Sequence, residues 1–420
     1  MFLRRKKIAA YFGCMLSMLL VLAGVEGAFA QGGIFAEDIA ESALSKREGP
    51  NIHIGSLEFH PFAGYEQKYD SNIYLEPDNG DSKPNGDMIS DIKLGTGAMM
   101  PLVPEREEDF MLKGYYYADI LMFWKNSGRN RVDHHAMGDL ELNFANDVKF
   151  RLNDTFVKTA DPPNSERTSL DKRIRNVLDG ALSYNREKIT GEVAYSLARD
   201  NYMTIANLRK NDHMMTLTGW YQMFPKTSIL GEYNYGIIDY DENTSNSNSY
   251  YHQGRVGVEG QILPKVTGIA KFGAEYRHYY FRQRKDYLGF TMDVKLKYDA
   301  TERTQISLGA SKRPVESTYQ INSFYDATRL QLDLKHQLLK RLQLGGTSFF
   351  QYDQYPERTA ERDEMAFRRD TLWGLEGGLD YEIREWCHVG TAYKFKQRHS
   401  RFREYDYNDH QVLCNVTLTY

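Results

Sequence analysis

The sequence predicts an all-β protein, a transmembrane antiparallel up-and-down β-barrel of about 18 strands. After residue 56, a stretch of ten or more residues alternates apolar with polar side chains and then stops at a turn, and this happens eighteen times. Successive strand side chains point to opposite faces, so one register can meet lipid and the other a wet lumen. Charges occupy the polar register of nearly every stretch, and no helical layer is evident to cover the apolar one. This combination favours a membrane barrel over a soluble sheet.

Residues 1–30 have the pattern of a secretory signal peptide. Four basic residues at positions 4–7 precede an apolar run and a small-x-small end at Ala28 and Ala30. A retained anchor helix is the alternative, but the apolar run is shorter than the roughly 20 residues that a helical span needs. Cleavage there would remove four basic residues and one acidic residue, so 53 basic and 57 acidic residues become 49 and 56, a formal net charge of −7. That charge argues against a nucleic-acid partner.

Residues 31–56 are expected to form a short periplasmic N-terminal segment, and residues 57–420 the outer-membrane barrel. Most connections after even-numbered strands are short, as at Asn146 and Asp147, whereas those after odd-numbered strands are mostly longer and more polar. Short periplasmic turns and long outer loops are typical of such barrels. The expected strands are 57–68, 88–100, 109–124, 132–145, 148–160, 174–185, 188–201, 210–223, 227–240, 249–262, 265–281, 286–298, 303–315, 325–338, 341–354, 368–382, 386–399 and 408–420.

The polar register gives the expected lining of the lumen. In residues 326–336, for example, Leu330, Leu332 and Leu334 alternate with charged or amide side chains. The candidate pore residues are Asp139, Glu141, Lys149, Arg151, Glu192, Glu232, Arg255, Glu259, Lys271, Glu275, Arg277, Asp293, Lys295, Lys297, Asp333, Lys335, Glu376 and Asp380, with Lys394 and Lys396 in the same register.

A lining of both signs is open to two interpretations. The charges can form cross-strand ion pairs that only satisfy one another, or they can line a path that favours polar, hydroxyl-rich solutes over ions of one sign. A barrel of sixteen to eighteen strands is wide enough for an aqueous channel unless loops fill it. The acidic segment 76–87 is the best candidate for a loop that folds inward. A non-conducting scaffold barrel remains the alternative.

Several histidines fall near the expected outer strand ends, so an outer-membrane hydrolase is considered as a remote alternative. They are His134, His135, His213, His252, His278, His399 and His410. No G-x-S-x-G nucleophile motif accompanies them, and we expect no enzyme, cofactor or metal. Cys387 and Cys414 lie on neighbouring expected strands. They can form a disulfide in an oxidising periplasm or remain two small lipid-facing residues.

The last strand ends on Val416, Leu418 and Tyr420 in the apolar register. Outer-membrane proteins in general end on such an aromatic strand, so we expect these residues to be the signal that the barrel assembly machinery recognises. Other expected partners are outer-membrane lipid and lipopolysaccharide, and components of polysaccharide export.

The first expected strand is followed by a short motif formed by Tyr69, Asp70, Asn72, Ile73 and Tyr74. We expect Asp70 and Asn72 to turn the strand into the first loop through side-chain to backbone hydrogen bonds. The motif resembles the start of the Putative beta-barrel porin 2 family. This resemblance implies an integral barrel in the outer membrane of a Gram-negative bacterium. Members of the family are often linked to exopolysaccharide systems, which implies a conduit for polar solute or exopolysaccharide.

Overall fold

The computed structural model describes residues 52–79, 82–106, 109–242, 247–281, 285–319, 322–361 and 364–420. The expected signal peptide and residues 31–51 of the expected periplasmic segment lie outside these residues. The last part of that segment includes a short strand, β1 (Ile52–Ile54), which forms a hairpin with the start of β2. None of the helices in the described part of the chain is long and apolar enough to cross a membrane.

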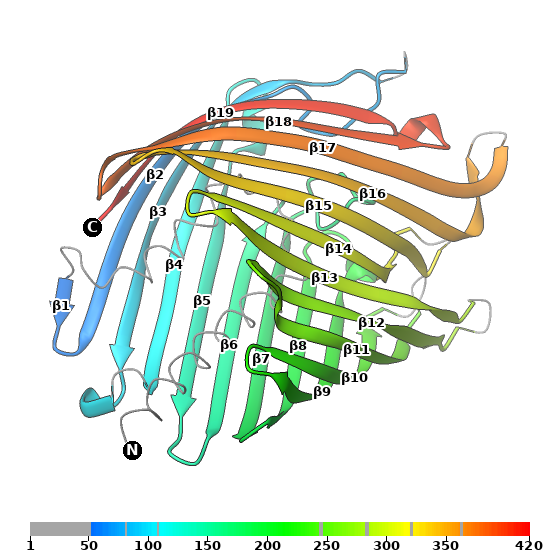
Figure 1. Ribbon diagram of the computed structural model, residues 1–420. Coiled ribbons are helices and arrows are strands. Elements are labelled where there is room, and N and C mark those ends of the chain that lie inside the picture. Colours follow the sequence, from blue (N-terminus) through cyan, green and yellow to red (C-terminus); the bar gives the residue numbers. More distant parts are fainter. Residues whose placement is uncertain are drawn as a thin grey trace.

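Eighteen antiparallel strands, β2 to β19, form one closed sheet (Figure 1). Their bounds are β2 (Leu57–Asp70), β3 (Asp87–Pro101), β4 (Phe110–Phe123), β5 (Arg131–Asn143), β6 (Val148–Thr159), β7 (Arg173–Arg186), β8 (Ile189–Tyr202), β9 (Lys210–Phe224), β10 (Thr227–Tyr240), β11 (Ser249–Leu263), β12 (Val266–Tyr279), β13 (Tyr287–Thr301), β14 (Thr304–Glu316), β15 (Phe324–Leu339), β16 (Leu342–Glu361), β17 (Glu364–Arg384), β18 (Cys387–Ser400) and β19 (Tyr407–Thr419). Four single-turn 3-10 helices lie in connections: η1 (Pro104–Arg106), η2 (Ser127–Arg129), η3 (Ala206–Leu208) and η4 (Arg403–Tyr405).

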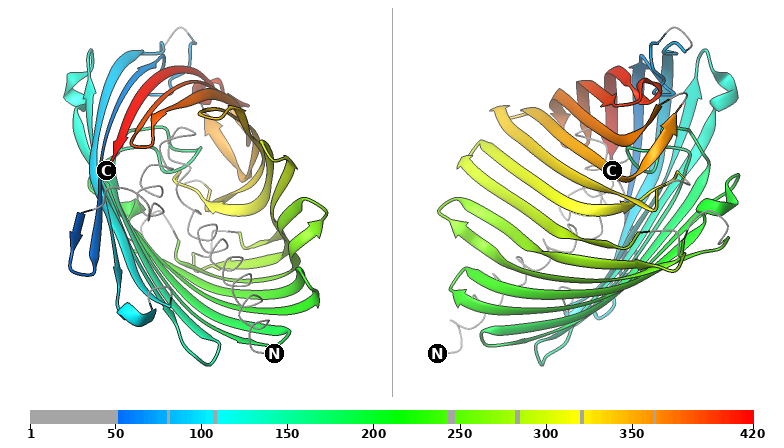
Figure 2. Two further views of the ribbon diagram at one scale, coloured as in Figure 1. Left: turned by 60° about the vertical axis from the view of Figure 1, so that its left-hand side comes forward. Right: turned by 90° about the vertical axis from the view of Figure 1, so that its right-hand side faces the viewer.

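Each strand pairs with its neighbour in the chain, and β19 returns to pair with β2 from Gln411 opposite Asp70 to Thr419 opposite Phe62. Figure 2 shows the strands curving into this ring. The predicted fold class and strand number are therefore confirmed. Closure leaves no unpaired edge among the eighteen strands, which a sheet inside lipid requires.

The two ends of the barrel differ as the loop lengths predict. One end, called here the short-turn end, has tight connections such as 187–188, 225–226 and 264–265. Asp147, Glu187 and Lys265 have positive φ in the short connections of this end. The other end, called here the long-loop end, carries longer connections such as 71–86, 160–172 and 241–248.

The hairpin formed by β16 and β17 differs from the prediction. Residues 355–367 were expected to be a long loop, but both strands continue through most of this range, with Arg358 opposite Phe367 and Thr359 opposite Ala366. A register shift between Gln354 and Arg358 accommodates Pro356, which lacks the N–H that a regular ladder uses. Polar residues interrupt the alternation in this range, and this is why the sequence suggests a loop.

Candidate functional site

The candidate site is the inner face of the barrel, and the alternation of exposure along each strand identifies that face. In β17, Trp373, Leu375 and Leu379 are exposed on the outside, whereas Glu376 and Asp380 in the alternate register are partly buried. In β15, Leu330 and Leu332 are likewise exposed, and Asp333 is not. The charged register and the exposed apolar register thus lie on opposite faces of the sheet.

A chain of ion pairs crosses four strands of the inner face. Glu232 in β10 lies directly opposite Arg255 in β11 and accepts a hydrogen bond from its Nε at 2.7 Å. Lys271 in β12 reaches Glu232 at 3.2 Å and Asp293 in β13 at 3.5 Å. The side chains are neighbours because residues opposite one another in adjacent strands share a face.

Most of the other candidate pore residues also have polar partners from nearby positions of the sheet. These pairs are Arg151 with Glu192 (3.3 Å), Glu275 with Arg277 (2.8 Å), Glu376 with Lys394 (3.5 Å), Asp380 with His388 (3.3 Å), Lys297 with Asp299 (3.8 Å), Glu259 with Trp220 (2.7 Å), Asp333 with Thr347 (2.7 Å), Asp139 with Asn153 (3.4 Å), and Glu141 with Lys149. Lys295, Lys335 and Lys396 lie opposite Ile269, Gly345 and Gly374.

A second feature is the connection between β6 and β7, residues 160–172, called here the strap. It reaches strands far from its own: Ser165 donates a hydrogen bond to Asp353 in β16 at 3.0 Å, and its carbonyl accepts one from Arg398 in β18 at 2.7 Å. Around the ring, eight strands (β8 to β15) separate β7 from β16, and seven (β5 to β2 and β19 to β17) separate β6 from β16. The strap therefore runs to the opposite wall at the long-loop end.

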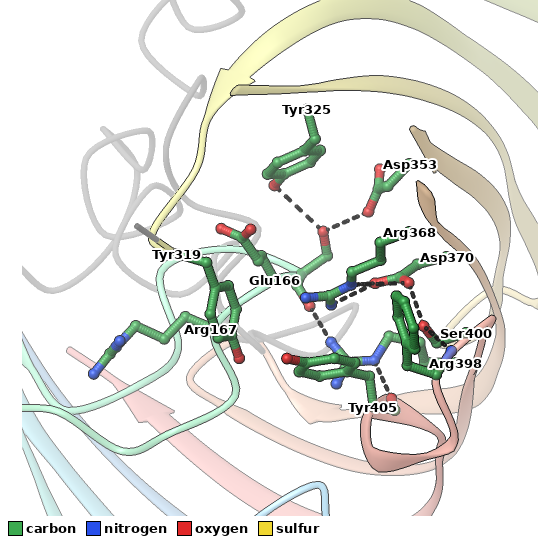
Figure 3. Close-up of polar contacts among 12 residues, drawn as sticks. Glu166, Arg167, Tyr319, Tyr325, Asp353, Arg368, Asp370, Arg398, Ser400 and Tyr405 are labelled. Atoms are coloured by element: carbon green, nitrogen blue, oxygen red, sulfur yellow. Dashed lines mark hydrogen bonds and ion pairs between the residues drawn. The ribbon is translucent and has the colours of Figure 1, made fainter. Parts of the chain in front are cut away.

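Glu166, which is labelled in Figure 3, anchors the strap on that wall. Its carboxylate accepts hydrogen bonds from Ser317 Oγ at 2.7 Å, from the Thr318 backbone N–H at 2.6 Å and from Thr318 Oγ1 at 2.9 Å. Only 1% of Glu166 is exposed. This burial raises the pKa of its carboxyl, and the hydrogen bonds from Thr318 and Ser317 offset the effect only in part.

Beside this anchor, Arg368 is enclosed by aromatic rings. Its guanidinium carbon lies 3.7 Å from the ring centre of Tyr405, 4.6 Å from that of Tyr355 and 5.3 Å from that of Tyr319. The same guanidinium pairs with Asp370 at 2.5 Å. The three tyrosines come from β16, η4 and the connection 317–323, so a single cation joins three segments of the long-loop end.

The inward segment is thus different from the one expected. The described residues of 76–87 bond to neighbouring parts of the same rim: Asn85 donates to Asn126 at 3.2 Å, and Glu76 bonds to Asn72 through its backbone. The acidic composition that suggested 76–87 does not determine where a loop docks. The strap contains Asp161, Pro162, Pro163 and Glu166 and gives no stronger signal in the sequence.

The motif after β2 makes the turn hydrogen bonds that were expected. Asp70 Oδ1 accepts the Asn72 backbone N–H at 2.9 Å, and Asn72 Oδ1 accepts the Glu76 N–H at 3.0 Å. Asn72 Nδ2 also donates to the Asn408 carbonyl at 3.0 Å, which ties the turn to the start of the neighbouring strand β19. Ile73 packs in a small cluster with Ile89 and Phe123, Tyr74 packs against this cluster, and Tyr69 is exposed.

The histidines near the long-loop end have identifiable partners. Four bond tyrosine hydroxyls on the outer face through Nδ1: His134, His213, His252 and His410. His135, His278 and His399 lie within 3.3, 3.0 and 3.6 Å of Asp119, Asp286 and Asp406. Each of these histidines therefore has a tyrosine or aspartate neighbour. No group of three or more His, Cys, Asp or Glu side chains among the described residues is placed to hold a metal ion.

The two cysteines are free, and the disulfide considered above is wrong for this structure. The strand register explains why. Cys387 lies opposite Leu418, and Cys414 lies opposite Thr391, so the two cysteines are separated by four positions along the β18–β19 pair. Of the expected assembly signal, Val416, Leu418 and Tyr420 are all exposed on the outer face.

Comparison with known proteins identifies the family of the chain. The family model described as Putative beta-barrel porin 2 matches residues 111–420. No curated protein matches significantly. Solved structures that match the chain include OpdK from Pseudomonas aeruginosa (TM-score 0.48, 8% identity, covering 86% of this chain and 99% of that chain) and OpdO from the same organism (0.49, 9%, 86% and 97%). The alcaligin receptor FauA from Bordetella pertussis is another (0.40, 10%, 86% and 76%).

Proposed function

The chain belongs to the Putative beta-barrel porin 2 family, and we propose that it is a conduit for polar, uncharged solute across the outer membrane of a Gram-negative bacterium. The porin-like barrel itself follows from the family and the closed sheet of eighteen strands. The solute, the path and the control of the path belong to the proposal.

The balance of charge on the inner face carries the proposal. The twenty charged positions predicted for the lumen comprise ten acidic residues and ten basic residues. Many of them pair with the opposite sign at 2.7 to 3.5 Å, as Glu232 does with Arg255 and Lys271. These twenty positions carry no net charge and so give little preference for cations over anions, whereas their many donors and acceptors can replace the water around hydroxyl groups. Oligosaccharide or exopolysaccharide is the solute class that fits this wall.

The strap supports a controlled conduit. It reaches the opposite wall and is held there by the buried carboxylate of Glu166. The same docking also favours the second candidate function, a scaffold barrel that does not conduct. The contacts of the histidines with tyrosines and aspartates support no catalytic role.

Conductance of the purified protein in planar bilayers distinguishes conduit from scaffold. We expect discrete current steps with weak ion selectivity, and swelling of liposomes in neutral oligosaccharides. A barrel without steps, and without swelling for any sugar, would refute the conduit and favour the scaffold. Polysaccharide synthesis or export genes beside the coding gene would support polysaccharide as the solute.

A further inference from the structure

Four tyrosine–histidine pairs recur on the outer face of the barrel. In each pair, a tyrosine hydroxyl lies 2.6 to 2.8 Å from Nδ1 of a histidine in the next strand. Each histidine is the fourth residue of a strand that descends from the long-loop end. The pairs are Tyr116 with His134, Tyr195 with His213, Tyr233 with His252, and Tyr393 with His410.

The pairs lie at one edge of the apolar band. In β19, the outward register changes from Asn408 above His410 to Val412, Val416 and Leu418 below it. Ten residues below His410 is the exposed Tyr420, and the same spacing leads from His134 to Phe144 and from His213 to Met223, both also exposed. Ten residues of a tilted strand rise ~25 Å, which is the height of the apolar band of an outer-membrane barrel.

The hydrogen-bonding pattern gives each pair an N–H donor, at histidine Nε2, that can bind an external acceptor. Each of these hydroxyls has one hydrogen, and its partner among the described residues is the histidine Nδ1, so we assign the hydrogen to that bond. A neutral imidazole that accepts at Nδ1 carries its own hydrogen on Nε2, and a protonated imidazole carries one there as well. Each pair therefore presents an N–H donor at this level in both protonation states.

Cations accompany two of the pairs. Lys158 in β6 lies directly opposite His134. Arg199 in β8 is exposed and lies opposite Asn211, two residues before His213 in the same outward register. Two outward carboxylates lie in this region: Asp154 accepts a hydrogen bond from Asn176 at 2.7 Å, and Asp239, which lies opposite Asn211, accepts one from Asn248. N–H donors beside lysine and arginine match the oxygens of a phosphate group.

We propose that the four pairs form a belt that binds the phosphate groups of lipopolysaccharide in the outer leaflet. The proposal depends on the outer-membrane placement and not on the conduit. The belt holds the barrel at a fixed depth, because its donors meet the phosphates when the apolar band is level with the acyl chains.

Binding of lipid A by the full chain in detergent, measured by native mass spectrometry, tests the proposal. The variant Y116F/H134F/Y195F/H213F keeps the aromatic rings and removes the donors of the two pairs that have neighbouring cations. We expect its affinity for bisphosphorylated lipid A to fall about tenfold, with little change for the dephosphorylated form. The variant Y233F/H252F/Y393F/H410F provides the same test at the other two pairs if the first fails to fold.

The control is T304V/H336F, which removes a comparable hydroxyl–histidine pair (2.9 Å) near the short-turn end. It should bind both lipids as the unchanged protein does. Folded belt variants, shown by heat-modifiable gel mobility, that keep the full preference for phosphorylated lipid would overturn the proposal. An equal loss in the control, or an equal loss for phosphatidylglycerol and lipid A, would overturn it as well. Absence of conductance would affect only the proposed function.

Discussion

Replacing Glu166 by alanine should release the strap. The carboxylate accepts three hydrogen bonds, from Ser317 Oγ, the Thr318 N–H and Thr318 Oγ1, and is almost completely buried. Each bond contributes about 1 kcal/mol net, and the donors would lose their partner in a buried place, so the loss is about 3 kcal/mol. At about 1.4 kcal/mol for each factor of ten, the ratio of docked to undocked strap falls roughly a hundredfold.

Single-channel recording in planar bilayers measures this change. A strap that leaves the opposite wall unblocks part of the long-loop end, so E166A should show larger or more frequent open steps than the unchanged protein. The matched control is R167A. Arg167 bonds to Asp171 within the strap at 2.6 Å and points away from the anchor in Figure 3. Traces of E166A that match both the control and the unchanged protein would show that Glu166 does not hold a gate.

Four further outcomes are expected. Because burial raises the pKa of Glu166, its neutral form is favoured when the strap is docked. Docking should therefore be strongest at pH values below the ordinary pKa of 4.5 and weaken as the pH rises through the higher pKa of the docked state. Open steps should become more frequent with this rise in pH. E166Q should abolish this dependence, and an unaltered pH profile in E166Q would contradict its origin. Replacing Glu232, Glu259 and Glu275 by lysine changes the charge at each position by two units and should shift the reversal potential toward anion selectivity. No shift would mean that these side chains do not face the permeating ions. Arg368→Ala leaves Asp370 buried without its cation and should cost about 3–5 kcal/mol, which lowers the temperature at which the heat-modifiable band unfolds; an unchanged temperature would show that the contacts of Arg368 with Asp370 and the three tyrosines do not stabilise the barrel. Tyr420→Asp should reduce the amount of folded barrel in membrane fractions, and normal levels would exclude a signal role for the last residue.

The strands could be predicted closely because alternation is local. In β15, the sequence alone separates Leu330 and Leu332 from Asp333, and the exposure of these residues follows the same division. The ion pairs follow once the register is known: Glu232 and Arg255 lie in consecutive expected strands joined by one turn or loop. The two-residue period of a strand indicates which face of the sheet a side chain occupies, and the order of neighbouring strands indicates its partner.

The docking of the strap could not be predicted, since its contacts join residues that are distant in the sequence and have no periodic pattern. Glu166 meets Thr318 across 152 positions, and Ser165 meets Arg398 across 233. The tyrosine–histidine pairs did leave a signal. A tyrosine precedes each histidine by 17 to 19 residues, and this recurrence distinguishes the four paired histidines from a catalytic cluster.

The pairing of β19 with β2 has a consequence for how the chain folds. Gln411 meets Asp70 and Thr419 meets Phe62, so the closing contacts join residues more than 340 positions apart, whereas every other pair of barrel strands is consecutive in the chain. Bringing such distant residues together costs loop-closure entropy. This cost slows folding, because the strand contacts that compensate for it form last. Until β19 arrives, β2 and β18 each present an open edge, which can pair with another chain and aggregate. The lifetime of this open sheet during synthesis and insertion therefore sets how much of the protein is lost before the ring closes.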